Sequence, residues 1–176
     1  GDDISANVRT VRGLPMELAG CGHPELMEIR GEIYLNNEEF RRINTEREEA
    51  GLPLYANPRN LAAGTAKLLD PREAGRRRLR LLLYGLGFCS ELPCETQHQL
   101  HQKLRDWGLP AHPKDNVWRA EGVDEVWARI QKLGERRHEF DYGTDGAVVK
   151  LDDFALQHAA ESTSHAHRRA MAYKFA

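Results

Sequence analysis

The chain has 176 residues, of which 40% are hydrophobic and 30% are charged, and its formal net charge at pH 7 is −2. This composition is that of a globular protein with about one core, and it excludes a basic surface over the whole molecule. No run is long and apolar enough to predict a membrane-spanning helix, and no signal peptide opens the sequence. The three cysteines form no C-x-x-C pair, which predicts a reducing cytoplasmic setting.

Hydrophobic periodicity predicts the elements of the first half. Residues 27–35 alternate between apolar and polar side chains, which predicts a strand with one buried face. Residues 36–51 predict a helix with a polar cap at its start. Residues 53–78 are predicted to be irregular except for a short helix over residues 61–69. Residues 79–88 are apolar enough for a core strand.

The second half predicts two helices followed by two strands. Apolar residues recur at helical spacing over residues 95–107 and again over residues 123–133, where Gly134 is expected to end the second helix. Residues 147–151 and 171–175 predict short apolar strands. Strands and helices follow no regular βαβ period, which favours an α+β fold over a doubly wound sheet.

Four residues on predicted strands carry charged or aromatic groups. Glu32 lies in the first strand, Tyr84 lies in the second, and Lys150 and Lys174 end two apolar runs. Taken alone, Glu32 is explained by a cross-strand ion pair and Tyr84 by a position in the core. Two lysines that end similar apolar strands instead favour a shared anionic ligand, such as a nucleotide phosphate.

Basic groups are concentrated in one part of the chain. Residues 55–65 combine turn formers with Arg59, and they predict a loop that enters a helix whose N-terminus could face a phosphate. A solvated basic surface and contact with a nucleic-acid backbone are the two alternatives for the residues that follow, and their local density favours the second. These residues are Lys67, Arg72, Arg76, Arg77, Arg78 and Arg80.

The order of these segments resembles that of bacterial NAD-dependent DNA ligases over nearly the whole chain. Residues 28–32 (EIRGE), 145–150 (DGAVVK) and 172–175 (AYKF) resemble three nucleotidyltransferase motifs, and residues 56–64 (ANPRNLAAG) resemble a distinctive string of that family. The resemblance implies that residues 1–176 are part of an adenylation domain, truncated at both ends. It also implies an α+β fold with mixed, largely antiparallel sheets and the nucleotide between them.

The resemblance further implies a reaction and a role for each candidate residue. The family seals nicks in duplex DNA, in replication and repair, through lysine-AMP and DNA-adenylate intermediates, with NAD and Mg²⁺ as cofactors. Glu32 would bind the adenosine ribose or help to organise metal, and Tyr84 would stack on adenine. Lys150 and Lys174 would stabilise charge on the α-phosphate. The enzyme would act as a monomer, and three basic residues would contact the nicked duplex: Arg59, Lys67 and Arg137.

The lysine that receives AMP in the family is absent from this sequence. No lysine of the chain is followed by x-Asp-Gly, so we expect the isolated chain to be inactive. The zinc site of the family would belong to a C-terminal region outside the sequence. Residues 167–169 (HRR) stand where the family usually has Pro-Arg-Trp, Glu161 stands where a glycine is common, and Gly143 where an acidic residue is common. These departures predict weaker support for Lys174.

Two alternatives to a ligase fragment stay open at this point. A decayed, non-catalytic nucleic-acid-binding remnant of a ligase domain is favoured by the missing nucleophile. It is disfavoured by the intact Glu32, Tyr84 and Lys150. An ATP-dependent ligase or a capping-type enzyme shares the general motif pattern, but it does not explain residues 56–64.

Overall fold

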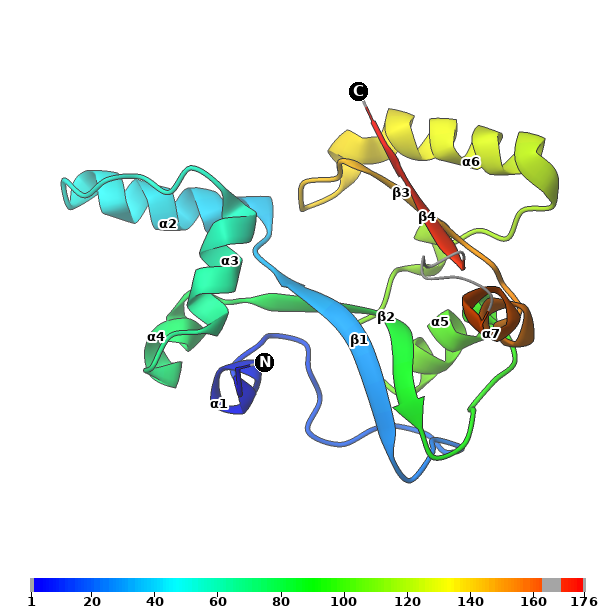
Figure 1. Cartoon of the computed structure of the whole chain (residues 1–176). Coiled ribbons are helices and arrows are strands. Elements are labelled where there is room, and N and C mark those ends of the chain that lie inside the picture. The colour runs from blue at the N-terminus through cyan, green and yellow to red at the C-terminus, as the bar shows by residue number, and fades with distance from the viewer. Residues whose placement is uncertain (1, 163–168, 176) are drawn as a thin grey trace. The chain divides into compact units, whose positions relative to one another are not determined.

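The computed structural model of the chain describes residues 2–162 and 169–175, and Figure 1 shows its elements along the chain. Contacts divide the chain into two compact units, each assembled from separate segments. The first unit comprises Gly1–Met16, Gly31–Leu82 and Asp141–Gly143, and the second comprises Glu17–Arg30, Leu83–Phe140 and Thr144–Ala176. Helices and small sheets are interspersed in the part of the chain described, which confirms the predicted α+β class.

Helices dominate the first unit. They are α1 (Ser5–Val8), α2 (Asn37–Glu49), α3 (Pro58–Ala66) and α4 (Pro71–Arg76). The side chains of Asn36, Asn57 and Asp70 cap α2, α3 and α4 by accepting hydrogen bonds from backbone N–H groups of the first turn. The prediction of irregular structure was therefore wrong for residues 71–76, and α3 begins three residues before the predicted helix. In both places an Asx-Pro pair starts a helix rather than a turn.

An apolar core holds the first unit together. Ile43 of α2 and Leu61 of α3 meet Leu35 and Leu79, which flank the two long strands, and all are at most 7% exposed. Burial of such side chains contributes about 1.5–3 kcal/mol each relative to leaving them in water. Leu35 and Leu79 thereby fix the ends of the long strands against the helical layer.

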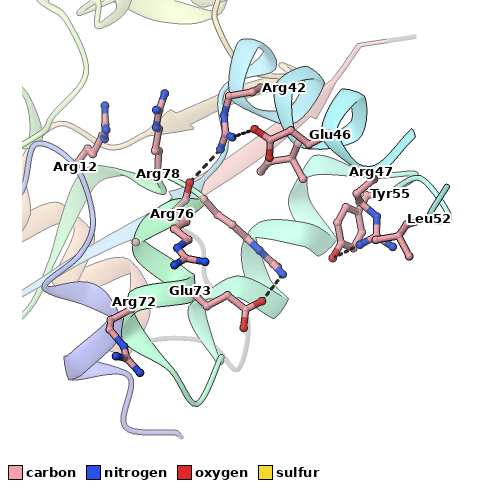
Figure 2. A pocket seen from close by; sticks show the side chains of 13 residues that line it. Arg12, Arg42, Glu46, Arg47, Leu52, Tyr55, Arg72, Glu73, Arg76 and Arg78 are labelled. Atoms are coloured by element: carbon pink, nitrogen blue, oxygen red, sulfur yellow. Dashed lines mark hydrogen bonds and ion pairs between the residues drawn. The ribbon is translucent and has the colours of Figure 1, made fainter. Parts of the chain in front are cut away.

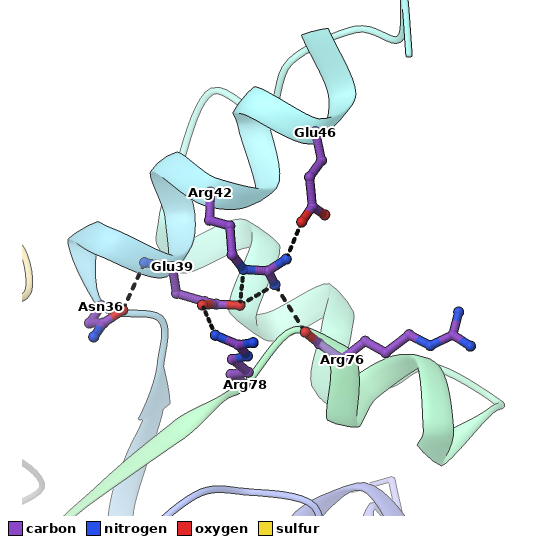
Figure 3. A network of polar contacts seen from close by, with 6 residues as sticks. All are labelled: Asn36, Glu39, Arg42, Glu46, Arg76 and Arg78. Atoms are coloured by element: carbon purple, nitrogen blue, oxygen red, sulfur yellow. Dashed lines mark hydrogen bonds and ion pairs between the residues drawn. The ribbon is translucent and has the colours of Figure 1, made fainter. Parts of the chain in front are cut away.

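A polar network around Glu39 ties α2 to the segment that follows α4 (Figure 3). The buried Glu39 carboxylate accepts a hydrogen bond from Arg42 Nε at 2.9 Å and lies 3.6 Å from Arg78 Nη1. Arg42 also pairs with Glu46 and donates to the Arg76 carbonyl oxygen at 3.0 Å. Buried charges need partners of this kind because desolvation of an unpaired carboxylate is costly.

The second unit contains α5 (Gln97–Asp106), α6 (Gly122–Arg136) and α7 (Phe154–Ser162), with short 3₁₀ turns η1 (Lys114–Asn116) and η2 (Arg137–Glu139). A capping box of Thr96 and Gln99 begins α5, whose buried face carries Leu100 and Leu104, and the buried Trp107 follows its last residue. Helix α6 continues two residues beyond Gly134, where it was expected to end.

In the described part of the chain, four strands form two small sheets. The long strands β1 (Met27–Tyr34) and β2 (Arg80–Cys89) pair with each other, and β3 (Gly146–Lys150) pairs with β4 (Ala170–Lys174). The second pair is antiparallel, with Gly146 opposite Lys174 and Lys150 opposite Ala170. These strands carry all four of the strand residues that the sequence singled out.

Candidate functional site

Lys150 and Tyr84 lie together in the second unit. Nζ of Lys150, the last residue of β3, donates to the carbonyl oxygen of Tyr84 in β2 at 3.2 Å. The same nitrogen lies 4.9 Å from the centroid of the Tyr84 ring, within the range of a cation–π contact. The pair therefore places a positive charge and a flat half-buried ring side by side, which is the combination that a nucleotide phosphate and base require.

The ammonium of Lys150 is partly removed from water. Burial lowers the pKa of Lys150, and the positive charge of Arg169 lowers it further. Among the described residues, no carboxylate forms an ion pair with Lys150. A desolvated ammonium without a counterion is stabilised by an incoming anion, because the anion restores the electrostatic solvation that burial removed.

Lys174 lies on the same face of the β3–β4 sheet as Lys150. Residues directly opposite in an antiparallel pair share a face, and residues two apart along a strand return to that face. The register places Lys174 beside Gly146 and Lys150 beside Ala170, so both lysines belong to one face. Four residue steps separate them along the ladder, a distance of about 13 Å between their backbones. A ligand of nucleotide length can span this interval when both side chains lean toward it.

Gly146 allows β3 and β4 to approach closely at Lys174. A Cβ atom added to Gly146 would overlap the carbonyl oxygen of Tyr173 and lie 3.1 Å from the Cα of Lys174. Both neighbours are backbone atoms, so they cannot move aside as a flexible side chain would. The Asp-Gly of residues 145–146 is thereby explained by the close approach of β4 rather than by a turn.

Lys174 itself is exposed, and aromatic rings flank it in sequence. The Tyr173 ring packs edge-on against Trp127 at 5.3 Å and against Phe175 at 6.0 Å between centroids. The guanidinium carbon of Arg137 lies 6.0 Å from the Phe175 ring centroid. These contacts hold the end of β4 against α6 and the η2 turn, so the backbone that carries Lys174 is supported from the opposite face of the β3–β4 sheet.

Glu32 belongs to the first unit and is exposed on β1. Its partner is Arg59 in the first turn of α3, with Nε of Arg59 3.5 Å from the Glu32 carboxylate. The sequence alone suggested a cross-strand ion pair for Glu32. The structure instead pairs Glu32 with a residue of a helix. Both side chains are more than half exposed, so the pair contributes about 0–1 kcal/mol and leaves both groups accessible to a ligand.

Lys67 and Arg137 lie in different units. Lys67 follows α3 in the first unit, where it pairs with Asp2 at 2.8 Å, and this partner raises the pKa of Lys67. Arg137 lies in the 3₁₀ turn after α6 in the second unit. Both side chains are exposed. Both side chains are therefore accessible to a phosphate backbone.

Part of the predicted basic cluster lines a cavity of about 790 Å³ in the first unit (Figure 2). Some of its charge is neutralised, since Arg42 pairs with Glu46 and Arg77 pairs with Glu73. Lys67 and Arg80 of the predicted cluster do not line it. Seven arginines line the cavity: Arg12, Arg42, Arg47, Arg72, Arg76, Arg77 and Arg78.

The departures from the family pattern before Lys174 fall mostly outside the described residues. His167 and Arg168 lie there, and Glu161 belongs to α7. Arg169 is described, and its backbone carbonyl accepts a hydrogen bond from the Leu151 N–H at 2.9 Å. This bond extends the β3–β4 ladder by one step beyond Lys150.

Comparison with known proteins assigns the family. The model of the NAD-dependent DNA ligase adenylation domain matches residues 1–176. The chain belongs to this family. It is 56% identical, over its whole length, to DNA ligase 1 of Opitutus terrae, of which it covers 26%. It is 45% identical over 99% of its length to a DNA ligase of Methylobacterium nodulans, covering 21% of that protein, and 43% identical over 99% to one of Trichlorobacter lovleyi, covering 25%.

The chain thus spans about a quarter of the length of these ligase relatives. Within residues 2–162 and 169–175, no helix is long and apolar enough to cross a membrane. The same residues include no group of three His, Cys, Asp or Glu side chains arranged to hold a metal ion. Membership of the family makes this an NAD-dependent adenylation domain by type.

Proposed function

We propose that this chain is the nucleotide-holding part of an NAD-dependent DNA ligase that seals nicks in duplex DNA, in replication and repair. The observation that carries the proposal is the contact of the Lys150 ammonium with the Tyr84 ring and carbonyl oxygen. NAD supplies the AMP group. The chain's own residues bind and orient that group, while a lysine outside this sequence receives it.

Each proposed residue acts through a simple interaction. The Tyr84 ring stacks on adenine, and Glu32 accepts hydrogen bonds from the ribose hydroxyls. Lys150 and Lys174 direct their ammonium groups toward the α-phosphate, where negative charge develops as the phosphoryl bond to nicotinamide mononucleotide breaks. A partly desolvated ammonium is effective in this role because the local dielectric is low.

Magnesium is part of the proposed reaction, in which it would neutralise charge on the phosphate oxygens. The described residues hold no cluster of three potential metal ligands, so the ion would rely on phosphate and water oxygens as well as on Glu32. The isolated chain is proposed to be inactive because no lysine in it precedes x-Asp-Gly.

Nicked duplex DNA is the proposed macromolecular partner. Arg59, Lys67 and Arg137 are exposed cations that can contact its phosphates. The proposed enzyme is a cytoplasmic monomer. The free cysteines Cys21, Cys89 and Cys94 support a reducing compartment.

Intact-mass measurement and a DNA-joining assay test the proposal. After incubation with NAD and Mg²⁺, the isolated chain should show no AMP adduct, whereas the full-length protein that carries it should gain one AMP and join a nicked duplex. A stable adduct on a lysine of the isolated chain would overturn the assignment of Lys150 and Lys174 as phosphate-binding residues. Failure of the full-length protein to take up AMP would instead support a non-catalytic remnant.

A further inference from the structure

The Tyr84 carbonyl oxygen has a second donor besides Lys150. Nε2 of Gln97, in the first turn of α5, donates to it at 2.9 Å and lies 3.2 Å from Nε2 of His101, one helical turn along. Gln97 and His101 are both at least 91% buried. A hydrogen-bond network therefore runs from the buried His101 through Gln97 and the Tyr84 carbonyl oxygen to the ammonium of Lys150.

The donor and acceptor capacities of the groups determine the proton positions in this network. The Tyr84 carbonyl oxygen can only accept, so the amide nitrogen of Gln97 faces it. The other amide proton of Gln97 points to Nε2 of His101, which must then accept, and the imidazole is neutral with its proton on Nδ1. Burial lowers the pKa of His101 to about 4, with smaller contributions from His112, Lys150, Arg105 and His98, so the neutral ring persists at pH 7.

Burial of His101 at this position has a desolvation cost. Its Nδ1 is buried and has no hydrogen-bond partner among the described residues. A leucine would fill the same helix face without that desolvation cost, as Leu100 and Leu104 do beside it. The acceptor that His101 presents to Gln97 is the feature that an apolar side chain lacks.

The backbone around α5 fixes the same assembly to β3. The Gln97 N–H donates to the Asp152 carbonyl oxygen at 2.7 Å, and the Phe154 N–H donates to the Glu95 carbonyl oxygen at 2.9 Å. Asp152 follows Lys150 by two residues. The start of α5 is therefore bonded to the end of β3 by its backbone and to Tyr84 by its Gln97 side chain.

We propose that Gln97 is a positioning residue for Lys150, with His101 holding the Gln97 amide in place. Gln97 fills one acceptor direction of the Tyr84 carbonyl oxygen and leaves the other to Lys150, so the ammonium is held next to the Tyr84 ring. This inference rests on the proposed function, because it assumes that Lys150 acts on the nucleotide phosphate. It adds two residues that act through Lys150 and not on the substrate.

Single-turnover self-adenylation of the full-length protein tests the inference. Gln97→Met keeps the side-chain length and removes both amide donors. We expect it to slow AMP transfer about tenfold with KM for NAD changed less than about twofold, the scale of one lost positioning hydrogen bond. Gln102→Met on the exposed face of α5 is the matched control, since the Gln102 side chain lies in solvent, and it should transfer AMP at the wild-type rate.

Substitutions at His101 separate positioning from packing. His101→Leu should slow transfer several-fold, whereas His101→Gln, whose amide oxygen can replace the Nε2 acceptor, should restore the rate to within about twofold. Equal rates for the two variants would overturn the role of His101. Gln97→Glu serves if Gln97→Met does not fold, because its carboxylate has the same shape but cannot donate to the Tyr84 carbonyl oxygen.

A double substitution distinguishes failure of the inference from failure of the proposed function. With Lys150→Ala already present, Gln97→Met should cause less than about a twofold further loss, because the two residues act through one path. A full additional tenfold loss would show that Gln97 acts elsewhere and would overturn the inference. Wild-type transfer by Lys150→Ala alone would remove Lys150 from the proposed function, and the positioning role would fall with it.

Discussion

The ammonium of Lys150 lies 4.9 Å from the centre of the Tyr84 ring, although 66 residues separate the two in sequence. The contact depends on two elements that meet beside α5. Backbone hydrogen bonds join residues 95 and 97 to residues 154 and 152 after β3. The Leu83 N–H of β2 donates to the Pro110 carbonyl oxygen after α5 at 2.7 Å. Helix α5 is therefore the common support of both side chains.

Lys150→Ala in the full-length protein should slow adenylyl transfer by about 10²–10³-fold, the usual effect of removing one preorganised electrostatic contact to a transition state. Lys150→Arg should recover part of the rate, because it keeps the charge but not the compact ammonium geometry. Rapid-quench measurement of AMP incorporation gives the rate. A loss confined to KM for NAD would contradict a role in the transition state.

Gly146→Ala should impair the site through β4 rather than through β3. The new methyl group would meet backbone atoms of Tyr173 and Lys174, so β4 must shift away from its partner. We expect AMP transfer to fall by about tenfold, a typical effect of misplacing a catalytic group by less than 1 Å. Gly143→Ala is the control, since a Cβ there meets nothing within 4 Å.

Arg59→Ala should weaken binding of nicked DNA and leave self-adenylation close to wild type. Loss of one phosphate contact lowers the slope of log affinity against log salt by about 1. Fluorescence anisotropy with a labelled nicked duplex at several salt concentrations measures that slope. Thermal stability should not change, because the pair with Glu32 is exposed. Abolished self-adenylation would move Arg59 from the DNA contact to the nucleotide site.

Acidification should destabilise the second unit through His101. Its pKa of about 4 lies below the ordinary value of 6.5, so the unfolded chain binds the proton more readily than the folded chain. Stability is complete above pH 6.5 and falls as the pH drops from about 6.5 to about 4, by up to about 3 kcal/mol. Burial lowers the pKa of His112 as well, which adds to the loss in the same direction.

Urea unfolding at pH 7.5 and pH 5, followed by tryptophan fluorescence, measures this loss, because Trp107, Trp118 and Trp127 all lie in the second unit. His101→Gln cannot titrate and should lose less stability between the two pH values than the wild-type chain does. An equal loss in both proteins would place the pH dependence on other groups.

Leu104→Ala should cost about 2–5 kcal/mol, because the removed methyl groups leave a cavity in a packed core. The Leu104 side chain is fully buried on α5, at 0% exposure. Leu92→Ala is the matched control, since Leu92 is 67% exposed and its truncation should change stability by less than about 0.5 kcal/mol. The same fluorescence assay compares the two variants.

Local patterns in the sequence predicted most individual elements. The alternation in residues 27–35 and the helical spacing in residues 95–107 and 123–133 correspond to β1, α5 and α6. The start of α4 was missed because Asp70 and Pro71 are typical of turns as well as of helix starts. A helix of this length has too few residues to show a period.

The site was predicted less completely than the elements. Glu32, Tyr84, Lys150 and Lys174 could be selected because charged and aromatic groups stand out on apolar strands. The contact of Lys150 with Tyr84 and the support from Gln97 could not, because they depend on tertiary pairing between distant segments. Gln97 and His101 carry no local signal, since polar residues on a helix usually face water.

The antiparallel register of β3 and β4 also determines which sequence changes this two-stranded sheet can accept. Exchange of Val148 or Ala172 for another residue leaves both lysines on one face. Insertion or deletion of a single residue within either strand turns one lysine to the opposite face, because successive side chains alternate. The β3–β4 sheet therefore tolerates substitutions far better than changes of strand length, and only length changes in steps of two keep both ammonium groups on the same side.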